Sequence, residues 1–341
     1  MSFLYNAWYM IGWSDELVDG AMIARTVLNM PIVAFRGRDG DSLHAMEDRC
    51  PHRFAPLSRG KLSEDGLQCG YHGLTFDMSG RCVRNVFAKT APSAARVRTF
   101  PIAERPSTIW VWTGDPGKAD EKRIPDIGYH GDPAMRYVKG VTTVKSDYRL
   151  LIDNLMDLCH STFIHPAFGG LEYMPRFHSE ELPDGSIVSD YYIADMINIF
   201  GADAIPADRI RNRDTIRWIA PSTHILASKA GLRDSDENLI DVPSAHILTP
   251  ESEKTTHYFW SSGVARASPI PDEELFATLQ QAFDAEDKPM VEAVQQRMGN
   301  ADLWDLHPVL LPTDASCVRV RRKLAALIEA EHADSASAAA G

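Results

Sequence analysis

Two cysteines and two histidines form a pattern that could hold a metal centre. Cys50 and His52 enclose one residue and Cys69 and His72 enclose two, so each pair offers one thiolate and one imidazole. If the two segments are apposed loops, both sulfurs can bind one iron and both imidazoles the other, as in a Rieske [2Fe–2S] cluster. Tetrahedral zinc is the alternative, but zinc fingers usually place the two cysteines together and the two histidines together. The spacing therefore favours the iron–sulfur cluster.

His160 and His165 form a second candidate metal site. They are five residues apart, about 140° on a continuous α-helix, so they can bind one ion only if the helix ends between them. Pro166 favours such an end, because the residue before a proline is pushed out of the α region. A redox cluster needs an electron acceptor, and two histidines with one carboxylate form an O₂-activating ferrous site. Spacing does not identify the carboxylate, and three of the four candidates on a late helix are expected to be solvated: Asp284, Glu286, Asp287 and Glu292.

The first third of the chain has the pattern of short strands separated by turns. Its β-prone runs are 31–36, 42–48, 67–77 and 107–112. The run 67–77 is interrupted by a loop, so both Cys/His pairs are expected on loops between strands. A Gly/Pro cluster at 113–117 marks a candidate boundary. We therefore expect an all-β domain over 1–116 and a second domain over 117–341.

The second domain has a mixed pattern. Apolar residues recur through 148–163 at the spacing of a largely buried helix. Acidic residues after Pro271 favour the start of a long helix toward Met298, and a further helix is expected within 303–330. The alanine- and serine-rich tail from about Ala333 is expected to be disordered. Four β-like runs lie between the helices, at 187–193, 216–219, 246–248 and 256–261, so this domain is expected to be α+β.

Composition bounds the class of protein. The net charge of −12 argues against a nucleic-acid-binding protein. Five cysteines at irregular spacing argue against a secreted disulfide framework. No apolar run approaches the roughly 18 residues that span a bilayer, and the amino terminus lacks the basic start of a signal peptide. We therefore expect a soluble cytoplasmic protein with no membrane partner. Residues 49–98 hold nine basic and three acidic side chains, so this stretch carries +6 and the rest −18.

The residues around the Cys/His pairs resemble those of the Rieske non-haem iron oxygenases. The similar segments are Cys-Pro-His-Arg at 50–53, Ala-Pro-Leu at 55–57 and Cys-Gly-Tyr-His-Gly-Leu at 69–74. Neither loop has a spare cysteine for the disulfide of respiratory Rieske proteins, so a cluster of relatively low potential is expected. The resemblance implies an all-β Rieske domain followed by an α+β catalytic domain of the helix-grip type, with helices on an antiparallel sheet. It also implies a mononuclear Fe(II) beside the [2Fe–2S] cluster.

The resemblance also assigns roles to individual residues of the second site. The segment 286–295 is similar to the family segment whose aspartate completes the iron site, which makes Asp287 the third ligand. Asp157 precedes His160 by one helical turn and is expected to accept a hydrogen bond from that ring. In the family, the aspartate at this position also reaches a cluster histidine of the neighbouring subunit, which pairs Asp157 with His72 and implies a head-to-tail homotrimer. The alternative is a carboxylate that only supports its own histidine. Asn154 of the same motif is assigned, with Asp157, to the catalytic residues.

Further segments are similar to the vanillate O-demethylase and dicamba monooxygenase branch of the family. They are 6–9, 110–112 with 114–116, 153–157 and 246–251. This branch implies a monooxygenase that removes the methyl group of a methoxylated aromatic acid, leaving a phenol and formaldehyde. Hydroxylation of a methyl group or ring of another small aromatic compound is the alternative.

Electrons and substrate must reach such an enzyme from outside. No G-x-G-x-x-G nucleotide fingerprint is present, so a separate NAD(P)H-dependent reductase or ferredoxin is expected as the partner. The basic stretch 49–98 could face that partner, or could offset cluster charge or face a sister subunit. A basic or imidazole donor would suit the carboxylate of such a substrate. Substrate contacts are expected from five residues on β-like runs: His224, Arg217, His246, Tyr258 and Trp260. Loops around 200–215 and 228–243 are expected at the mouth of the site.

Overall fold

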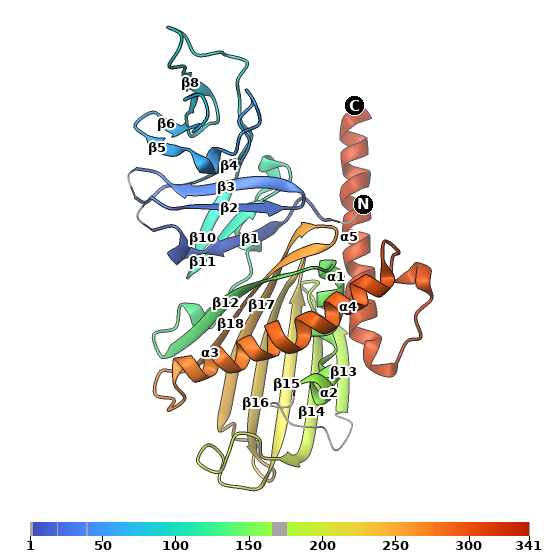
Figure 1. Ribbon diagram of the computed structural model, residues 1–341. Coiled ribbons are helices and arrows are strands. Elements are labelled where there is room, and N and C mark those ends of the chain that lie inside the picture. The colour runs from blue at the N-terminus through green and yellow to red at the C-terminus, as the bar shows by residue number, and fades with distance from the viewer. Residues whose placement is uncertain (1–2, 19, 39, 166–175, 341) are drawn as a thin grey trace. The chain divides into compact units, whose positions relative to one another are not determined.

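The computed structural model describes residues 3–18, 20–38, 40–165 and 176–340, which form two compact units (Figure 1). The first unit runs to Asp126, beyond the boundary expected at 116. The cause is that the segment after the Gly/Pro cluster turns back onto the first unit. Trp8 Nε1 donates to the carbonyl of Asp120 (2.9 Å), and Arg105 forms an ion pair with Glu121 (3.1 Å). The second unit begins at Ile127.

The first unit is all-β among its described residues. One antiparallel sheet has the order β1 (Trp8–Trp13), β11 (Thr108–Trp112) and β10 (Ile102–Arg105). A second has the order β2 (Met22–Val27), β3 (Met30–Arg36), β4 (Leu43–Glu47) and β9 (Thr99–Phe100). The third has the order β5 (Lys61–Ser63), β6 (Gly66–Gln68), β7 (Thr75–Phe76) and β8 (Cys82–Arg84). The predicted strands are confirmed, and the two Cys/His pairs lie after β4 and between β6 and β7.

The second unit is a seven-stranded antiparallel sheet with helices packed on it. The strand order is β12 (Met135–Val144), β18 (Thr255–Ala265), β17 (Ile240–Ser252), β16 (Thr223–Leu232), β15 (Arg209–Ile219), β14 (Ile187–Ile197) and β13 (Arg176–Glu181). The helices are α1 (Tyr148–Met156), α2 (Ser161–Ile164), α3 (Asp272–Gln280), α4 (Lys288–Met298) and α5 (Ala315–Ala340). Figure 1 shows α3 and α4 crossing one face of this sheet. The predicted α+β class is therefore confirmed.

The late helices differ in detail from the sequence prediction. The helix expected from Pro271 to Met298 contains a π-helical segment, η8 (Gln281–Asp287), between α3 and α4. Four buried side chains in this region recur every four residues. An α-helix completes a turn in 3.6 residues, so such side chains would drift around it. The wider π turn keeps them on one face. These buried side chains are Leu279, Phe283, Asp287 and Val291.

The helix expected within 303–330 is present, whereas the predictions for the tail and for the mouth loops are wrong. The helix begins at Ala315, because prolines at 308 and 312 interrupt the segment before it. It then continues to Ala340 through the tail expected to be disordered, which is rich in alanine, the strongest helix former. The long loops at the mouth are shorter than expected, because β15, β16 and β17 extend into them and leave only 198–208 and 233–239 between strands. No helix among the described residues is long and apolar enough to cross a membrane.

Candidate active site and cluster loops

The two Cys/His loops of the first unit have the same backbone hydrogen bonds. The N–H of each cysteine donates to the carbonyl five residues later, at 2.9 Å from Cys50 and 2.8 Å from Cys69. The N–H four residues later donates back to the cysteine carbonyl, at 2.8 Å and 3.1 Å. The residues that close these turns, Phe54 and Gly73, both have positive φ, 59° and 73°. The chain thus builds two equivalent turns, each presenting one sulfur and one imidazole.

The sulfurs and imidazoles of these loops lie at different depths. Cys50 and Cys69 are each 2 % exposed and pack in the core of the unit. His52 is exposed and His72 half-buried, and their ring centroids are 4.6 Å apart. Burial, together with the adjacent Cys69, raises the pKa of Cys50 to about 11, so a thiolate pair here needs a bound cation. Buried sulfurs below surface imidazoles fit a cluster with one thiolate-bound and one histidine-bound iron.

The helix expected over 148–163 is broken into three pieces, and the breaks position the second pair of histidines. Helix α1 ends at Met156, and Asp157 is extended (φ −114°, ψ 92°). A single 3₁₀ turn, η6 (Leu158–His160), and the short α2 follow. His165 directly after α2 is non-helical (φ −116°, ψ 81°), so the prediction that the helix ends between His160 and His165 is confirmed. Pro166 itself lies outside the described residues.

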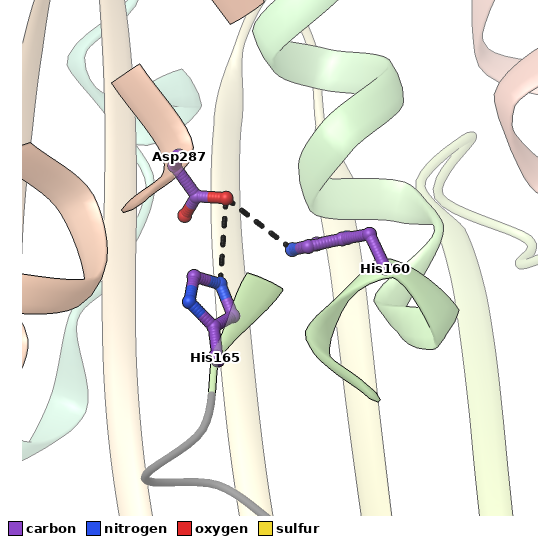
Figure 2. A group of neighbouring side chains, drawn as sticks. All are labelled: His160, His165 and Asp287. Atoms are coloured by element: carbon purple, nitrogen blue, oxygen red, sulfur yellow. Dashed lines mark ion pairs between the residues drawn. The ribbon is translucent and has the colours of Figure 1, made fainter. Parts of the chain in front are cut away.

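His160, His165 and Asp287 converge on one point (Figure 2). Asp287 Oδ1 lies 3.5 Å from His160 Nε2 and 3.3 Å from His165 Nε2, and the three potential ligand atoms lie within 4.8 Å of one another. An imidazole nitrogen binds a transition metal at about 2.1 Å, so ligands of one ion stand about 3 to 4 Å apart. Among the described residues the group consists of two imidazoles and one carboxylate, a donor set that fits a ferrous site with open positions.

The other ring nitrogen of each histidine is held by an oxygen that can only accept. His160 Nδ1 lies 2.5 Å from the carbonyl oxygen of Asp157, and His165 Nδ1 lies 2.8 Å from Glu286 Oε2. Each Nδ1 therefore carries a proton, and Nε2 is the nitrogen that faces Asp287. Burial would lower the pKa of His165, but hydrogen bonds and charge from Asp287 and Glu286 outweigh it and raise the pKa. With Nδ1 held in this way, Nε2 is the nitrogen of each ring that a metal would bind.

The four carboxylates that sequence spacing left open have distinct partners. Asp287 is 3 % exposed and faces the two histidines. The other three are half-buried, and each accepts a hydrogen bond within the protein. Glu286 bonds to His165, Asp284 accepts from Thr142 Oγ1, and Glu292 accepts from the N–H of Lys145 (2.8 Å). Sequence reasoning named Glu286 as a candidate ligand but did not predict its bond to His165.

Asn154 and Asp157 both lie next to this group, and the side chain of Asp157 makes other hydrogen bonds than the one predicted. Asn154 Nδ2 donates to Asp287 Oδ1 (3.0 Å) and so fixes the carboxylate. The carboxylate of Asp157 does not accept from His160, because its backbone carbonyl takes that bond. The carboxylate instead accepts from the N–H of Cys159 (2.9 Å) and from Thr313 Oγ1 (3.0 Å). This is a correction to the predicted support of His160 by the Asp157 side chain.

A surface hollow of about 340 Å³ opens beside Asp157 and His160. Its other walls include Trp304, Val309 and Leu310. These three side chains are exposed, Val309 by 89 %. One side of the histidine–carboxylate group is therefore reached from a partly apolar surface.

The expected substrate residues divide between the two faces of the sheet. Strand register places His224 beside His246 and His246 beside Trp260, so these three share a face. Phe283 of η8 packs on His246 and Trp260 with ring centroids 5.4 Å apart in both cases. Arg217 is on the opposite face, where it bonds to Asp184 and Ser186. The segment that carries Asp287 thus covers the His224–His246–Trp260 row, and Arg217 is not part of it.

Comparisons with known proteins agree with this arrangement. Residues 7–101 match the Rieske [2Fe–2S] domain, and residues 144–330 match the vanillate O-demethylase oxygenase C-terminal domain. The chain is 38 % identical to the dicamba O-demethylase oxygenase component of Stenotrophomonas maltophilia, over 98 % of this chain and 100 % of the relative. It is 33 % identical to a vanillate O-demethylase oxygenase subunit of Pseudomonas sp. (strain ATCC 19151), over 90 % and 97 %. The crystal structure of dicamba monooxygenase with non-heme iron and dicamba matches with a TM-score of 0.84 and 34 % identity, over 98 % of this chain and 100 % of that one.

Proposed function

This chain belongs to the Rieske non-haem iron oxygenases with a vanillate O-demethylase-type C-terminal domain, and we propose that it is the terminal oxygenase of an aromatic O-demethylase. The proposed substrate is a methoxylated aromatic acid resembling vanillate. The methyl carbon is hydroxylated with O₂, two electrons and two protons, which releases water. The resulting hemiacetal breaks into a phenol and formaldehyde. Relatives named for dicamba and vanillate O-demethylation support this reaction.

The convergence of His160, His165 and Asp287 is the observation that carries the proposal. We assign these three as the ligands of mononuclear Fe(II), and Cys50, His52, Cys69 and His72 as the ligands of the [2Fe–2S] cluster. When bound, the iron supplies O₂ activation and the cluster supplies electrons. The surrounding residues orient the proposed iron ligands. Glu286 and the Asp157 carbonyl fix the two rings, and Asn154 fixes the carboxylate.

Substrate binding is assigned to the row His224, His246 and Trp260. It lies under Phe283, four residues from Asp287, which puts a bound ring next to the proposed iron. All three residues are at most 3 % exposed, so a ring bound against them would be shielded from water. Burial lowers the pKa of His246 to about 4, so this imidazole is neutral at pH 7 and binds a carboxylate by hydrogen bonding rather than by charge.

The remaining assignments concern partners. We propose a homotrimer in which the cluster histidine His72 of one subunit meets Asp157 of the next. The partly apolar hollow beside Asp157 and His160 supports a protein surface docking there. Electrons are proposed to come from a separate NAD(P)H-dependent reductase or ferredoxin. The exposed basic side chains near the cluster loops, such as Arg53, Arg59 and Lys61, would attract an acidic partner.

A coupled assay tests the function. The iron-loaded protein is mixed with a compatible reductase, NADH and O₂, and methoxybenzoates are screened for formaldehyde. Formaldehyde formed in step with loss of substrate supports O-demethylation. Oxygen uptake with a hydroxylated product and no formaldehyde would replace it with methyl or ring hydroxylation.

A further inference from the structure

Helix α5 holds the C-terminal end of α1 through side chains in its first turn. Ser316 Oγ donates to the carbonyl of Met156 (2.9 Å), and Cys317 Sγ donates to the carbonyl of Asp153 (3.4 Å). The last carbonyls of an α-helix lack partners within the helix, so a neighbouring element must satisfy those that are buried. Here the donors lie 160 and 164 residues further along the chain. Helix α5 therefore supplies part of the cap of α1.

One turn further along α5, Arg321 forms a buried ion pair with the side chain of Asp153. Arg321 Nε lies 2.9 Å from both carboxylate oxygens, and its second terminal nitrogen, Nη2, lies 2.6 Å from Oδ2. Arg321 is 7 % exposed. A guanidinium that meets a carboxylate through two nitrogens fixes the direction of the contact as well as its length. The ion pair therefore fixes how α1 is rotated about its own axis relative to α5.

The rotation of α1 matters because the residue after Asp153 faces the proposed iron site. Asn154 Nδ2 donates to Asp287 Oδ1 (3.0 Å). Successive residues of an α-helix point about 100° apart, so turning Asp153 toward α5 also sets the direction of Asn154. A rotation by about 20° would move an atom at the helix surface, about 5 Å from the axis, by about 1.7 Å. Such a shift is enough to break the hydrogen bond to Asp287.

We propose that Arg321 is a positioning residue for the iron site, whose ion pair with Asp153 fixes the rotation of α1 and so holds Asn154 against Asp287. This inference rests on the proposed function, in which Asp287 is an iron ligand. It makes α5 a support of the iron site, although that helix carries none of the proposed ligands. Iron affinity then depends on the ion pair, whether or not the stability of the fold does.

Replacing both members of the ion pair separates positioning from stability. Asp153→Leu/Arg321→Met puts apolar side chains in place of a buried ion pair, a change that folded proteins often tolerate. Competition with a chelator, on the full-length protein with its cluster in place, measures the dissociation constant for Fe(II). We expect this constant to rise about tenfold. The unfolding temperature and the EPR spectrum of the reduced cluster should stay unchanged.

Two further variants on α5 calibrate this effect. Arg321→Lys keeps the charge but replaces the two-point contact with a single ammonium, so the dissociation constant for Fe(II) should rise by less. Lys323, on the same helix, forms an ion pair with Glu181 of β13 (2.7 Å) instead of with α1. Lys323→Met is therefore the matched control and should leave the constant unchanged.

Combining the pair variant with Asn154→Ala tests the route of the effect. If Arg321 acts through Asn154, the combined variant should raise the dissociation constant no more than Asn154→Ala does alone. Effects that multiply would overturn the proposal, and so would an unchanged constant in the folded pair variant. If the pair variant does not fold, Arg321→Lys takes its place and is judged by the same two criteria.

His160→Ala distinguishes failure of this inference from failure of the proposed function. This substitution removes a proposed ligand and should abolish tight binding of Fe(II). If it does not, the assigned iron site is wrong and the inference fails with it. If it does, and the Arg321 variants bind Fe(II) like the unaltered protein, the inference alone fails.

Discussion

At the scale of single residues, a carboxylate that is not itself a ligand orients one side of the proposed iron site. Glu286 Oε2 accepts from His165 Nδ1, and this bond fixes which nitrogen faces Asp287. Such bonds raise the basicity of the ligand and hold its ring in place. The carboxyl of Glu286 is therefore as much part of the site as the groups that touch the metal.

Replacing Glu286 should weaken metal binding without removing a ligand. We expect Glu286→Leu to raise the dissociation constant for Fe(II) by about 10- to 100-fold. Glu286→Gln, which keeps a neutral acceptor, should have a smaller effect. Competition with a chelator measures both constants. Glu273→Gln, an exposed carboxylate on α3, is the matched control and should leave the affinity unchanged. Unaltered affinity in Glu286→Leu would mean that the bond to His165 does not orient the ring.

The buried imidazole of His224 should make stability depend on pH. Its pKa is lowered to about 3 in the folded chain, against about 6.5 when unfolded. Between these values the unfolded state binds the extra proton, so stability is lost as pH falls below about 6.5, by up to about 1.4 kcal/mol per pH unit. Urea unfolding at pH 7.5 and pH 5 should show a smaller pH effect in His224→Leu. His178→Gln, which replaces an exposed histidine, should retain the full effect.

At the scale of elements, the π-helical segment η8 sets the direction of Asp287. It keeps Phe283 over the sheet face and Asp287 toward the histidines. In a plain α-helix, side chains four residues apart would differ in direction by about 40°. Extra residues of this kind in helices are frequent at functional sites. Without the π turn, one of these two side chains would leave its position.

Deleting one residue from η8 tests this directly. Removal of Ala285, which is exposed, should restore an α-helix and turn Asp287 away from His160 and His165. The expected result is loss of the mononuclear iron, with the cluster and the helical circular dichroism retained. Metal analysis and visible spectra measure the two metals separately. Ala285→Ser keeps the chain length and should bind iron normally. If the deletion variant still binds iron at full stoichiometry, η8 does not direct Asp287.

At the scale of the whole molecule, the two proposed metal sites lie in different units. Cys50, His52, Cys69 and His72 lie in the unit ending at Asp126, and the histidine–carboxylate group lies in the unit beginning at Ile127. The basic stretch 49–98 belongs to the first unit, whereas the rest of the chain carries −18. We propose that electrons pass between the two sites from His72 of one subunit to Asp157 of the next.

Asp157 is the residue at which that assembly can be tested. In Asp157→Asn the amide oxygen can still accept from Cys159 N–H or Thr313, so the fold and both metals should be retained. Electron transfer from the reduced cluster should slow by on the order of 100-fold. Stopped-flow reoxidation of the cluster with substrate and O₂ measures this rate. Asp305→Asn, an exposed change near the same hollow, is the control. Near-normal reoxidation in Asp157→Asn would remove this residue from the proposed bridge.

Local sequence alone determined the cluster loops and the class of each unit. Each Cys/His pair lies within a six-residue turn, 50–55 or 69–74, and backbone hydrogen bonds inside that turn fix its geometry. The strand and helix patterns likewise reflect local propensity and periodicity. The break between His160 and His165 was also readable, because proline restricts the residue before it.

Contacts between distant parts of the chain decided the rest. Asn154 and Asp287 are 133 residues apart, and His165 and Glu286 are 121 apart, so no spacing rule identifies either pair. The row of His224, His246 and Trp260 depends on strand register, in which a shift of one residue would turn each side chain to the other face. The position of the third proposed ligand, the orientation of both imidazoles and the polar row were therefore decided by tertiary structure, because each requires elements that only packing brings together.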